Sequence, residues 1–434
     1  MTTVYCHPDP DMLPAIDDEV IPVLLYDAIS RDEAAFIGNA VVPAIRRLPA
    51  AASTLAFDFL SIALAVTAAD TFVSRDRAPD RWCRRLEVSV ALHDPAAWQP
   101  HIPTLELALG FLSGDRWTID IEGDGLAPPE PSSRHTIRSI DLDDGIDCVS
   151  LFSGGLDSTI GVLDLVEQGR RPLLVSHAYN RDSTIQDVVL QQLALGLPRL
   201  AINLYPGNIQ GKTNDNTMRA RSFNFLALGI VAASALQQIT QATSVDLIVP
   251  ENGFIAINPP LTPRRVGALS TRTTHPYFLA LVQRILDSMG MGVRITNPYE
   301  FRTKGEIFAR CLAPTAIRSV ASQTMSCSNW KRKGKACGRC VPCLIRRASF
   351  QVAGVTDNSL YETPILQWGG LGKKLDDLLA VTSSIKRAAA SPDRPLAVRG
   401  GPLPNDPATR AGYDSVVRRG LQEVAQFLGL RGLL

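Results

Sequence analysis

The sequence predicts an α/β fold with a doubly wound, mostly parallel sheet between about residues 147 and 300. Short apolar runs alternate there with longer amphipathic runs, which is typical of strands joined by crossover helices. The first of these transitions passes through a polar turn, Ser153-Gly154-Gly155-Leu156-Asp157-Ser158. In such sheets ligands bind beyond the carboxyl ends of the strands. We therefore expect the functional site at that edge.

Five buried strands account for this prediction. They are short runs rich in Val, Ile and Leu, at residues 148–152, 172–177, 200–204, 245–249 and 292–297. A run with helical spacing follows the first strand and ends at Gly169, and further helices are expected at 185–195 and 218–236. Because parallel strands end at one edge, the loops that follow them should converge.

The turn after the first strand suits a phosphate. Its glycines let the backbone approach an anion closely, and its serine hydroxyls can donate to phosphate oxygens. The positive end of the next helix dipole points at the same spot. Asp157 makes sense there if Mg²⁺ accompanies the phosphates. The alternative is an ordinary glycine turn, and no lysine sits at the helix start as in the G-x-x-x-x-G-K-[ST] loop.

Length and composition indicate a globular chain of two or three domains. It has 434 residues, 45% hydrophobic and 20% charged, with a net charge of +1. This balance argues neither for nor against a nucleic-acid partner. No apolar run reaches the ~18 residues of a membrane span. No membrane contact is expected, and the N-terminus lacks a basic region followed by an apolar one. We expect a cytoplasmic protein.

Residues 1–140 should form an N-terminal α+β accessory domain. Its expected strands and helices lie at 20–25, 55–72, 85–93, 105–112 and 117–121. Asp58 and Asp70, on the longer helix, are expected to be caps or solvated residues. A linker rich in Pro, Gly and Ser then leads to the central domain, residues 141–355.

Residues 356–434 should form a C-terminal helical extension. Helices are expected at 375–390 and 413–428, with a Pro- and Gly-rich break between them. We find no chemistry in this region, and we interpret it as a packing or partner-binding element.

Four clustered cysteines predict a metal site. Cys327, Cys337, Cys340 and Cys343 supply four thiolates in a short lobe, residues 326–346, with close spacing that lets a turn fold around one ion. Four cysteines without an open position favour structural Zn²⁺. An iron–sulfur cluster or redox thiols are the alternatives. Basic residues surround the cluster, and we expect them to offset its negative charge; contact with RNA or DNA is a less favoured alternative.

The polar turn and the cysteine cluster together resemble one family. Ser-Gly-Gly-x-Asp-Ser looks like the pyrophosphate loop of the PP-loop ATP pyrophosphatases, and C-x9-C-x2-C-x2-C some 170 residues later resembles the QueC (7-cyano-7-deazaguanine, or preQ0, synthase) family. Arg221 matches the arginine of its Ala-Arg-Asn segment, and Lys304 the lysine of its Lys-x-Glu-Ile element. The resemblance implies the adenine nucleotide α-hydrolase-like (HUP-type) fold, Zn²⁺ at the cysteines, and ATP adenylating a 7-deazaguanine carboxylate.

The chain also departs from the short biosynthetic enzymes. Its two flanking regions have no counterpart in them, and residues 251–276 replace their Asp-Cys-Arg-Pro type sequence. The long form resembles the QueC-like proteins of bacterial anti-phage systems, of the kind named QatC. That resemblance implies a protein partner, encoded in the same defence operon, whose N-terminal amine receives the deazaguanine.

Roles for individual residues follow from chemistry and resemblance together. Ser153, Gly154, Gly155 and Ser158 would hold pyrophosphate, Asp157 would bind Mg²⁺, and Arg221 and Lys304 would stabilise the charge that develops on the phosphates. Lys212 would close over the phosphates or be a solvated lysine. His275 would accept a proton from the attacking amine or simply cap a turn. The expected substrate-binding residues are Asn252, Arg265, Arg272, Thr274 and His275.

Three functions remain open from the sequence. The first is an ATP-dependent deazaguanine enzyme of phage defence that transfers its product to a protein. The second is preQ0 synthesis with ammonia, for queuosine or DNA modification. The third is a non-catalytic zinc- and nucleotide-binding subunit of a defence complex, and the intact Asp157 argues against it.

Overall fold

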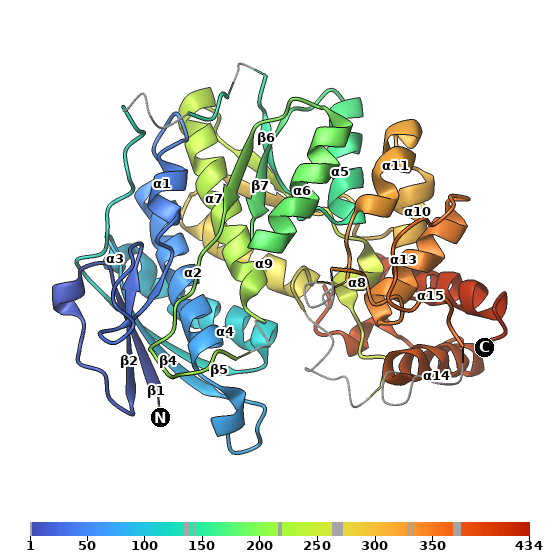
Figure 1. The fold of residues 1–434 in the computed structure, drawn as a ribbon, viewed down its shortest axis with the longest axis horizontal. Coiled ribbons are helices and arrows are strands. Elements are labelled where there is room, and N and C mark those ends of the chain that lie inside the picture. Colours follow the sequence, from blue (N-terminus) through green and yellow to red (C-terminus); the bar gives the residue numbers. More distant parts are fainter. Residues whose placement is uncertain are drawn as a thin grey trace.

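The computed structural model contains two five-stranded parallel sheets. It describes residues 2–133, 139–142, 145–215, 219–262, 272–327, 330, 334–367 and 375–434. In Figure 1 the N-terminal sheet lies at the left, the second sheet occupies the middle, and the C-terminal helices lie at the right. Every strand pairing in both sheets is parallel.

The second sheet confirms the predicted fold class. Its strand order is β10-β9-β6-β7-β8. The strands are β6 (Cys148–Leu151), β7 (Pro172–His177), β8 (Arg199–Ile202), β9 (Val245–Ile248) and β10 (Val293–Thr296). All five lie within two residues of the predicted ranges. The sheet order sets β6, which leads into the polar turn, between β9 and β7.

Helices cover both faces of this sheet. On β7, Leu173 and Val175 face a core shared with α7 (Arg221–Thr240). Leu174 faces the opposite way and packs with residues of α5 (Leu156–Glu167) and α6 (Asn180–Leu193). Alternate residues of one buried strand therefore meet two different helix layers, which is the doubly wound arrangement.

The N-terminal unit is a second parallel sheet, where the sequence had indicated an α+β unit. Its order is β3-β2-β1-β4-β5, with β1 (Thr2–His7), β2 (Val20–Leu25), β3 (Ala35–Ile37), β4 (Arg85–Ala91) and β5 (Arg116–Glu122). The sequence analysis missed β1 and β3. Central β1 pairs with strands on both sides, and only the fold shows which strands are partners and in which direction they run.

One hydrophobic core joins the two sheets. Helix α2 (Thr54–Phe72) packs against α7 between them (Figure 1), and the Phe59 and Phe223 rings lie 5.0 Å apart. Both helices are long and apolar enough to cross a membrane, contrary to the sequence analysis, which found no run of that length. Their candidate windows are 94% and 72% buried in the protein, so the apolar surface is used for the core.

Asp58 and Asp70 are buried, which corrects the expectation of caps or solvated residues. Asp58 accepts hydrogen bonds from the backbone N–H groups of His93 and Asp94 at 2.8 and 3.0 Å. Asp70 pairs with Arg84 at 2.5 Å and also accepts from the Ala220 N–H at 2.8 Å. Because Ala220 directly precedes α7, Asp70 ties the N-terminal unit to the start of that helix.

The C-terminal extension packs on the second sheet's loops. Its helices are α14 (Asp376–Ala390) and α15 (Pro407–Gly429), close to the predicted ranges. They share a core with α13 (Val341–Val352) and with α8 (Gly253–Ile257), the short helix that follows β9. Helix α15 also contacts α10 (Lys304–Ala309), which follows β10. The extension thus packs against the rest of the chain, and its role in partner binding stays a prediction.

Candidate functional site

The polar turn connects β6 to α5 as predicted. Gly154 has φ +74°, which favours glycine, and Gly155 is the N-cap residue of α5. The Ser153 and Ser158 hydroxyls lie 3.1 Å apart, and the Gly155 N–H donates to Ser153 Oγ at 3.3 Å. The first N–H groups of an α-helix have no partner within the helix. The loop therefore has the geometry of an anion site.

Gly154 also allows close packing around the loop. A side chain there would contact Gln186 of α6 at 3.2 Å. The Gly154 carbonyl accepts from the Met325 N–H at 3.1 Å, which joins the loop to the segment before the cysteine cluster.

Asp157 lies at the centre of a buried polar cluster. Its Oδ1 forms an ion pair with Lys304 Nζ, and its Oδ2 accepts from Asn252 Nδ2 at 2.7 Å. All three side chains are buried. They come from the ends of β6, β10 and β9, which are neighbours in the sheet. The predicted convergence of loops thus brings these three residues together.

Glu251 joins this cluster and was missed by the sequence analysis. Asn252 Nδ2 also donates to Glu251 Oε1 at 2.9 Å, so one amide bridges the two carboxyl groups. Burial and the neighbouring Asp157 raise the pKa of Glu251 well above its ordinary value. Burial alone would raise the pKa of Asp157, but the neighbouring groups, Lys304 foremost, outweigh burial and lower it. The position of Glu251 shortly after β9, at the same edge of the sheet, was the signal that could have identified this residue.

Asn252 has a structural role besides its predicted one. Its side-chain oxygen caps α8 by accepting from the Ile255 N–H at 3.1 Å. With its amide on the two carboxyl groups, Asn252 holds the end of β9 against α5.

Arg221 lies at the start of α7, on the β7 side of the loop. Its guanidinium forms an ion pair with Asp182 at 2.7 Å and stacks over the Tyr179 ring at 4.5 Å. Both partners belong to the segment after β7. The cation is therefore held at the predicted edge of the sheet and remains about one-third exposed.

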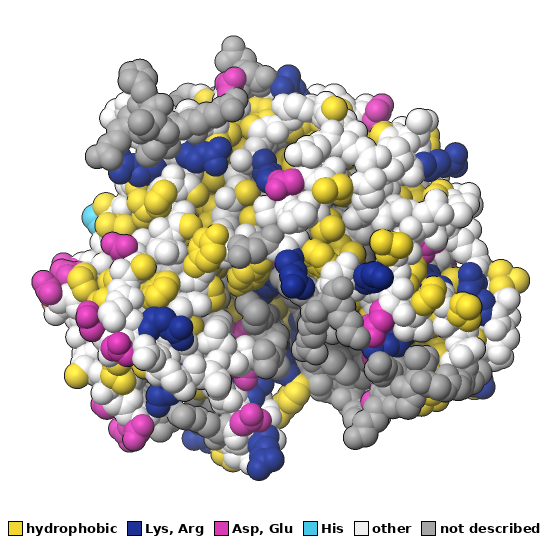
Figure 2. Space-filling model, in the orientation of Figure 1, with side chains coloured by type: hydrophobic (Ala, Val, Ile, Leu, Met, Phe, Trp, Pro, Cys, Tyr) yellow, Lys and Arg dark blue, Asp and Glu magenta, His cyan; other side chains and the backbone are white. Residues whose placement is uncertain are grey.

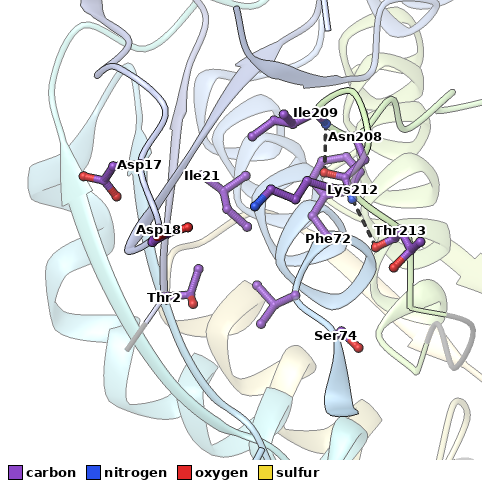
Figure 3. A pocket seen from close by; sticks show the side chains of 11 residues that line it. Thr2, Asp17, Asp18, Ile21, Phe72, Ser74, Asn208, Ile209, Lys212 and Thr213 are labelled. Carbon is purple, nitrogen blue, oxygen red and sulfur yellow. Dashed lines mark hydrogen bonds between the residues drawn. The ribbon is translucent and has the colours of Figure 1, made fainter. Parts of the chain in front are cut away.

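Lys212 lies beside the N-terminal unit. It lines a small cavity of about 70 Å³ with Asp17, Asp18 and Ile21 near the start of β2, and with Phe72 at the end of α2 (Figure 3). Its backbone N–H donates to the Ile209 carbonyl at 3.1 Å. The structure does not bring Lys212 into the Asp157 cluster, and its phosphate role stays a prediction.

His275 caps α9 (Pro276–Ser288), in agreement with the structural alternative for this residue. Its Nδ1 accepts from the Tyr277 N–H at 3.2 Å, and its ring packs edge-on against Phe111 at 5.0 Å. Burial, together with the Arg272 charge, lowers the pKa of His275 to about 3. A histidine with that pKa is a weak proton acceptor.

Of the other predicted substrate residues, the structure describes Arg272 and Thr274. Arg272 donates to the Phe111 carbonyl at 2.8 Å and stacks over that ring at 4.4 Å, so it docks this segment on α4 (Ile102–Ser113). Thr274 lies beside it, with a buried hydroxyl. Arg265 lies outside the described residues. Substrate contact by these three residues remains a prediction.

The four cysteines come together in the structure, as the sequence predicts. All are buried, and their Sγ atoms lie within 4.8 Å of one another. Two Sγ pairs are 3.9 and 3.8 Å apart, which fits the ~3.8 Å sulfur separation expected for a tetrahedron of ~2.3 Å Zn–S bonds. The N–H groups of Cys337 and Cys340 point at Sγ atoms of the cluster at 3.3 Å. This donor set fits Zn²⁺.

Basic residues after the cluster support the structure. Arg346 is buried and donates to the Thr324 hydroxyl and the Ala321 carbonyl at 2.7 and 2.6 Å. Arg347 donates to the Gly338 carbonyl at 3.1 Å. On the face shown in Figure 2, described basic side chains are mixed with acidic and apolar ones. Contact with nucleic acid stays the less favoured prediction.

Comparison with known proteins matches the region that carries the cluster. The family model described as queuosine biosynthesis protein QueC matches residues 274–354, which include Lys304 and the four cysteines. This part of the chain is QueC-like. The predicted resemblance is confirmed, and it supports an enzyme of the PP-loop family. Membership of the defence group stays a prediction.

Curated relatives extend the QueC-like likeness. The 7-cyano-7-deazaguanine synthase of Thiobacillus denitrificans is 25% identical over 226 residues, 49% of this chain and 97% of that enzyme. The same enzyme of Novosphingobium aromaticivorans is 29% identical over 233 residues, covering 49% and 93%. That of Cupriavidus taiwanensis is 42% identical over 69 residues, covering 16% and 29%. The first two alignments span nearly the whole of the relative, and about half of this chain lies outside them.

Proposed function

We propose that this protein uses ATP to adenylate the carboxylate of a 7-deazaguanine and then transfers the acyl group to an amine. The observation that carries the proposal is the polar loop at the start of α5, where Asp157 in the first turn of the helix forms a buried ion pair with Lys304 of α10. The QueC-like relatives, named as 7-cyano-7-deazaguanine synthases, support the substrate class.

The reaction assigns a role to each part of the site. A substrate carboxylate oxygen attacks the α-phosphorus of ATP, the α–β bond breaks, and pyrophosphate leaves. Backbone N–H groups of the loop, with Ser153 and Ser158, would hold that leaving group. Lys304 and Arg221 are fixed cations for the developing charge. The amine then attacks the acyl carbon, and AMP leaves.

The carboxylates fit a divalent cation. Asp157 and Glu251 offer oxygen atoms bridged by one amide, and hard oxygen ligands are those that Mg²⁺ prefers. A bound Mg²⁺ would offset phosphate charge. Asp157 would then exchange part of its contact with Lys304 for the cation, which leaves the Lys304 ammonium free to face a phosphate.

We propose the N-terminus of a partner protein as the acceptor amine, in anti-phage defence in the cytoplasm. Two observations favour a large acceptor. About half of this chain lies outside the alignment with the biosynthetic relative, and residues 251–276 depart from the biosynthetic sequence pattern. Ammonia, which would lead to preQ0, is the competing acceptor, and the names of the relatives favour it.

Pyrophosphate release tests the chemistry. Purified protein with ATP, Mg²⁺ and 7-carboxy-7-deazaguanine should release pyrophosphate and AMP. The matched control is Lys304→Met, which keeps the length of the side chain but removes the charge. No release with this or any other deazaguanine, with ammonia or with a co-purified partner, would refute the enzyme and leave the non-catalytic binding module.

Intact mass spectrometry tests the acceptor. The chain would be expressed together with the proteins encoded next to it. A deazaguanine adduct on the N-terminal residue of one of them is the expected result. Free preQ0 formed from ammonia, with every neighbouring protein unmodified, would instead establish the biosynthetic reaction.

A further inference from the structure

The C-terminal helix α15 reaches the residues on both sides of Lys304. Glu423, on α15, accepts hydrogen bonds from the Thr303 hydroxyl and from the Gly305 N–H, the latter at 3.2 Å. Lys304 lies between these two residues and pairs with Asp157. One carboxylate of the extension therefore holds the backbone from which the Lys304 side chain enters the site.

Gly305 permits this contact. A side chain at residue 305 would place its Cβ 2.6 Å from Glu423 Oε1. Because Cβ atoms do not approach other atoms so closely, only glycine lets the carboxylate reach this N–H. The absence of a side chain at residue 305 is thus a requirement of this contact.

Other contacts also fix α15 in place. Arg419 pairs with Glu306 at 2.6 Å and donates to the Phe301 carbonyl at 2.8 Å. Tyr413 donates to Glu300 at 2.8 Å. The Glu306 carboxylate also accepts from the Thr303 N–H at 2.9 Å, so Arg419 is coupled to this turn. Tyr413 docks the helix away from Thr303 and Gly305, so loss of docking and loss of the Glu423 contact can be separated by mutating Tyr413.

We propose that Glu423 is a positioning residue that holds Lys304 in register with Asp157, so that the C-terminal extension is part of the active site. Its catalytic consequence rests on the proposed function, whereas the positioning of Lys304 does not. The sequence analysis treated the extension as packing without chemistry, and the Glu423 contacts give it a share in the chemistry.

The environment of Glu423 supplies a second readout. Burial raises the pKa of Glu423 to about 7, and the Glu306 carboxylate adds to this increase. The hydrogen bonds from Thr303 and Gly305 and the Arg419 charge lower the pKa in part. If the carboxylate positions Lys304, activity should rise as Glu423 ionises between about pH 6 and 8. Glu423→Gln keeps the shape of the side chain and should flatten that rise.

The first experiment measures Lys304 directly, without substrate. Competitive acetylation followed by peptide mass spectrometry gives the reactivity of each lysine in the full-length protein. Buried Lys304 should be protected in the wild type, and Glu423→Ala should raise its acetylation rate roughly tenfold relative to exposed lysines. Tyr413→Phe and Gln422→Ala, on the same helix, should leave Lys304 protected. An unchanged Lys304 rate in Glu423→Ala, or an equal rise in Tyr413→Phe, would overturn the proposal.

A double mutant guards against a mere folding defect. Gly305→Ala should clash with the Glu423 carboxylate and expose Lys304, and Glu423→Ala should remove that clash. The double variant should therefore be no worse than Glu423→Ala alone, by acetylation and by melting temperature. Additive losses would show that residues 305 and 423 act independently and would refute the pairing.

Pyrophosphate release then tests the catalytic consequence. Glu423→Ala should lower kcat roughly tenfold or more, with a smaller change in KM for ATP. If the wild type releases no pyrophosphate while acetylation of Lys304 depends on Glu423, the proposed function fails and the positioning stands. A wild type that is active together with a fully active, Lys304-protected Glu423→Ala variant would overturn the positioning role.

Discussion

Lys304 and Asp157 form a buried ion pair although 147 residues separate them in the chain. Their strands, β10 and β6, flank β9, and the carboxyl ends of all three lie at one edge of the sheet. Burial makes the pair sensitive to the loss of either member, because the remaining charge is left without compensation. The same two residues thus serve stability and the proposed chemistry.

Asp157→Asn should abolish pyrophosphate release and also destabilise the protein by about 3–5 kcal/mol, because it removes the carboxylate that pairs with buried Lys304. Adding Lys304→Met should restore most of the stability and none of the activity. Urea unfolding and pyrophosphate release measure the two effects. Equal stability of the single and double variants would contradict the buried pair.

Glu251→Gln should stabilise the ATP-free protein at alkaline pH. The folded-state pKa of Glu251 is raised above 4.5, so its contribution to stability is full below pH 4.5 and is lost as pH rises through the folded-state pKa. The substitution should raise the free energy of unfolding by about 1–3 kcal/mol near pH 8 and by little near pH 5. Exposed Glu167→Gln is the control. The same gain at both pH values would argue against a buried, proton-binding carboxyl group.

Cys340→Ser should remove the metal and unfold the lobe around it. Elemental analysis should find about one zinc per wild-type chain. The variant should contain much less and melt at a lower temperature. Because Met325, directly before this lobe, packs against the cysteine cluster and contacts the polar loop, ATP binding should weaken as well. Cys83→Ser, outside the cluster, should keep both metal and melting temperature. Iron with a visible absorption band would instead support the iron–sulfur alternative.

His275→Asn separates the two roles considered for this residue. Asparagine is a good N-cap, so the variant should keep the start of α9 and nearly the full activity. His275→Ala should lose about 1 kcal/mol of stability through the missing cap. A fall in kcat of about a hundredfold in a stable His275→Asn variant would point to proton transfer instead.

Local patterns account for the parts of the site that the sequence predicted. The polar loop and three of the four cysteines lie within short stretches whose residue types and spacing already limit their chemistry. Strand positions in the second sheet followed from apolar runs in the same way. By contrast, the residues of β1 lack an apolar run long enough to predict a strand. Glu251 cannot be distinguished in the sequence from other polar residues that follow strands.

Contacts between distant residues explain the rest. His275 could be assigned to its cap only when the Tyr277 N–H and the Phe111 ring were placed around it. The sequence does not indicate the direction of the loop that carries Lys212, and in the fold this lysine lies beside the N-terminal unit. In each case burial and partners determine the chemistry.

The sequence by itself determined that this chain has a loop rich in Gly and Ser at the start of a helix and four cysteines that could hold one metal ion, because both depend largely on residues close together in the chain. Only the tertiary structure determined which groups contact Asp157, and that Glu423 accepts hydrogen bonds from the residues on both sides of Lys304. Those contacts span 95 to 147 residues. The order of strands in the sheet and the packing of α15 create them, and neither is written in any local pattern.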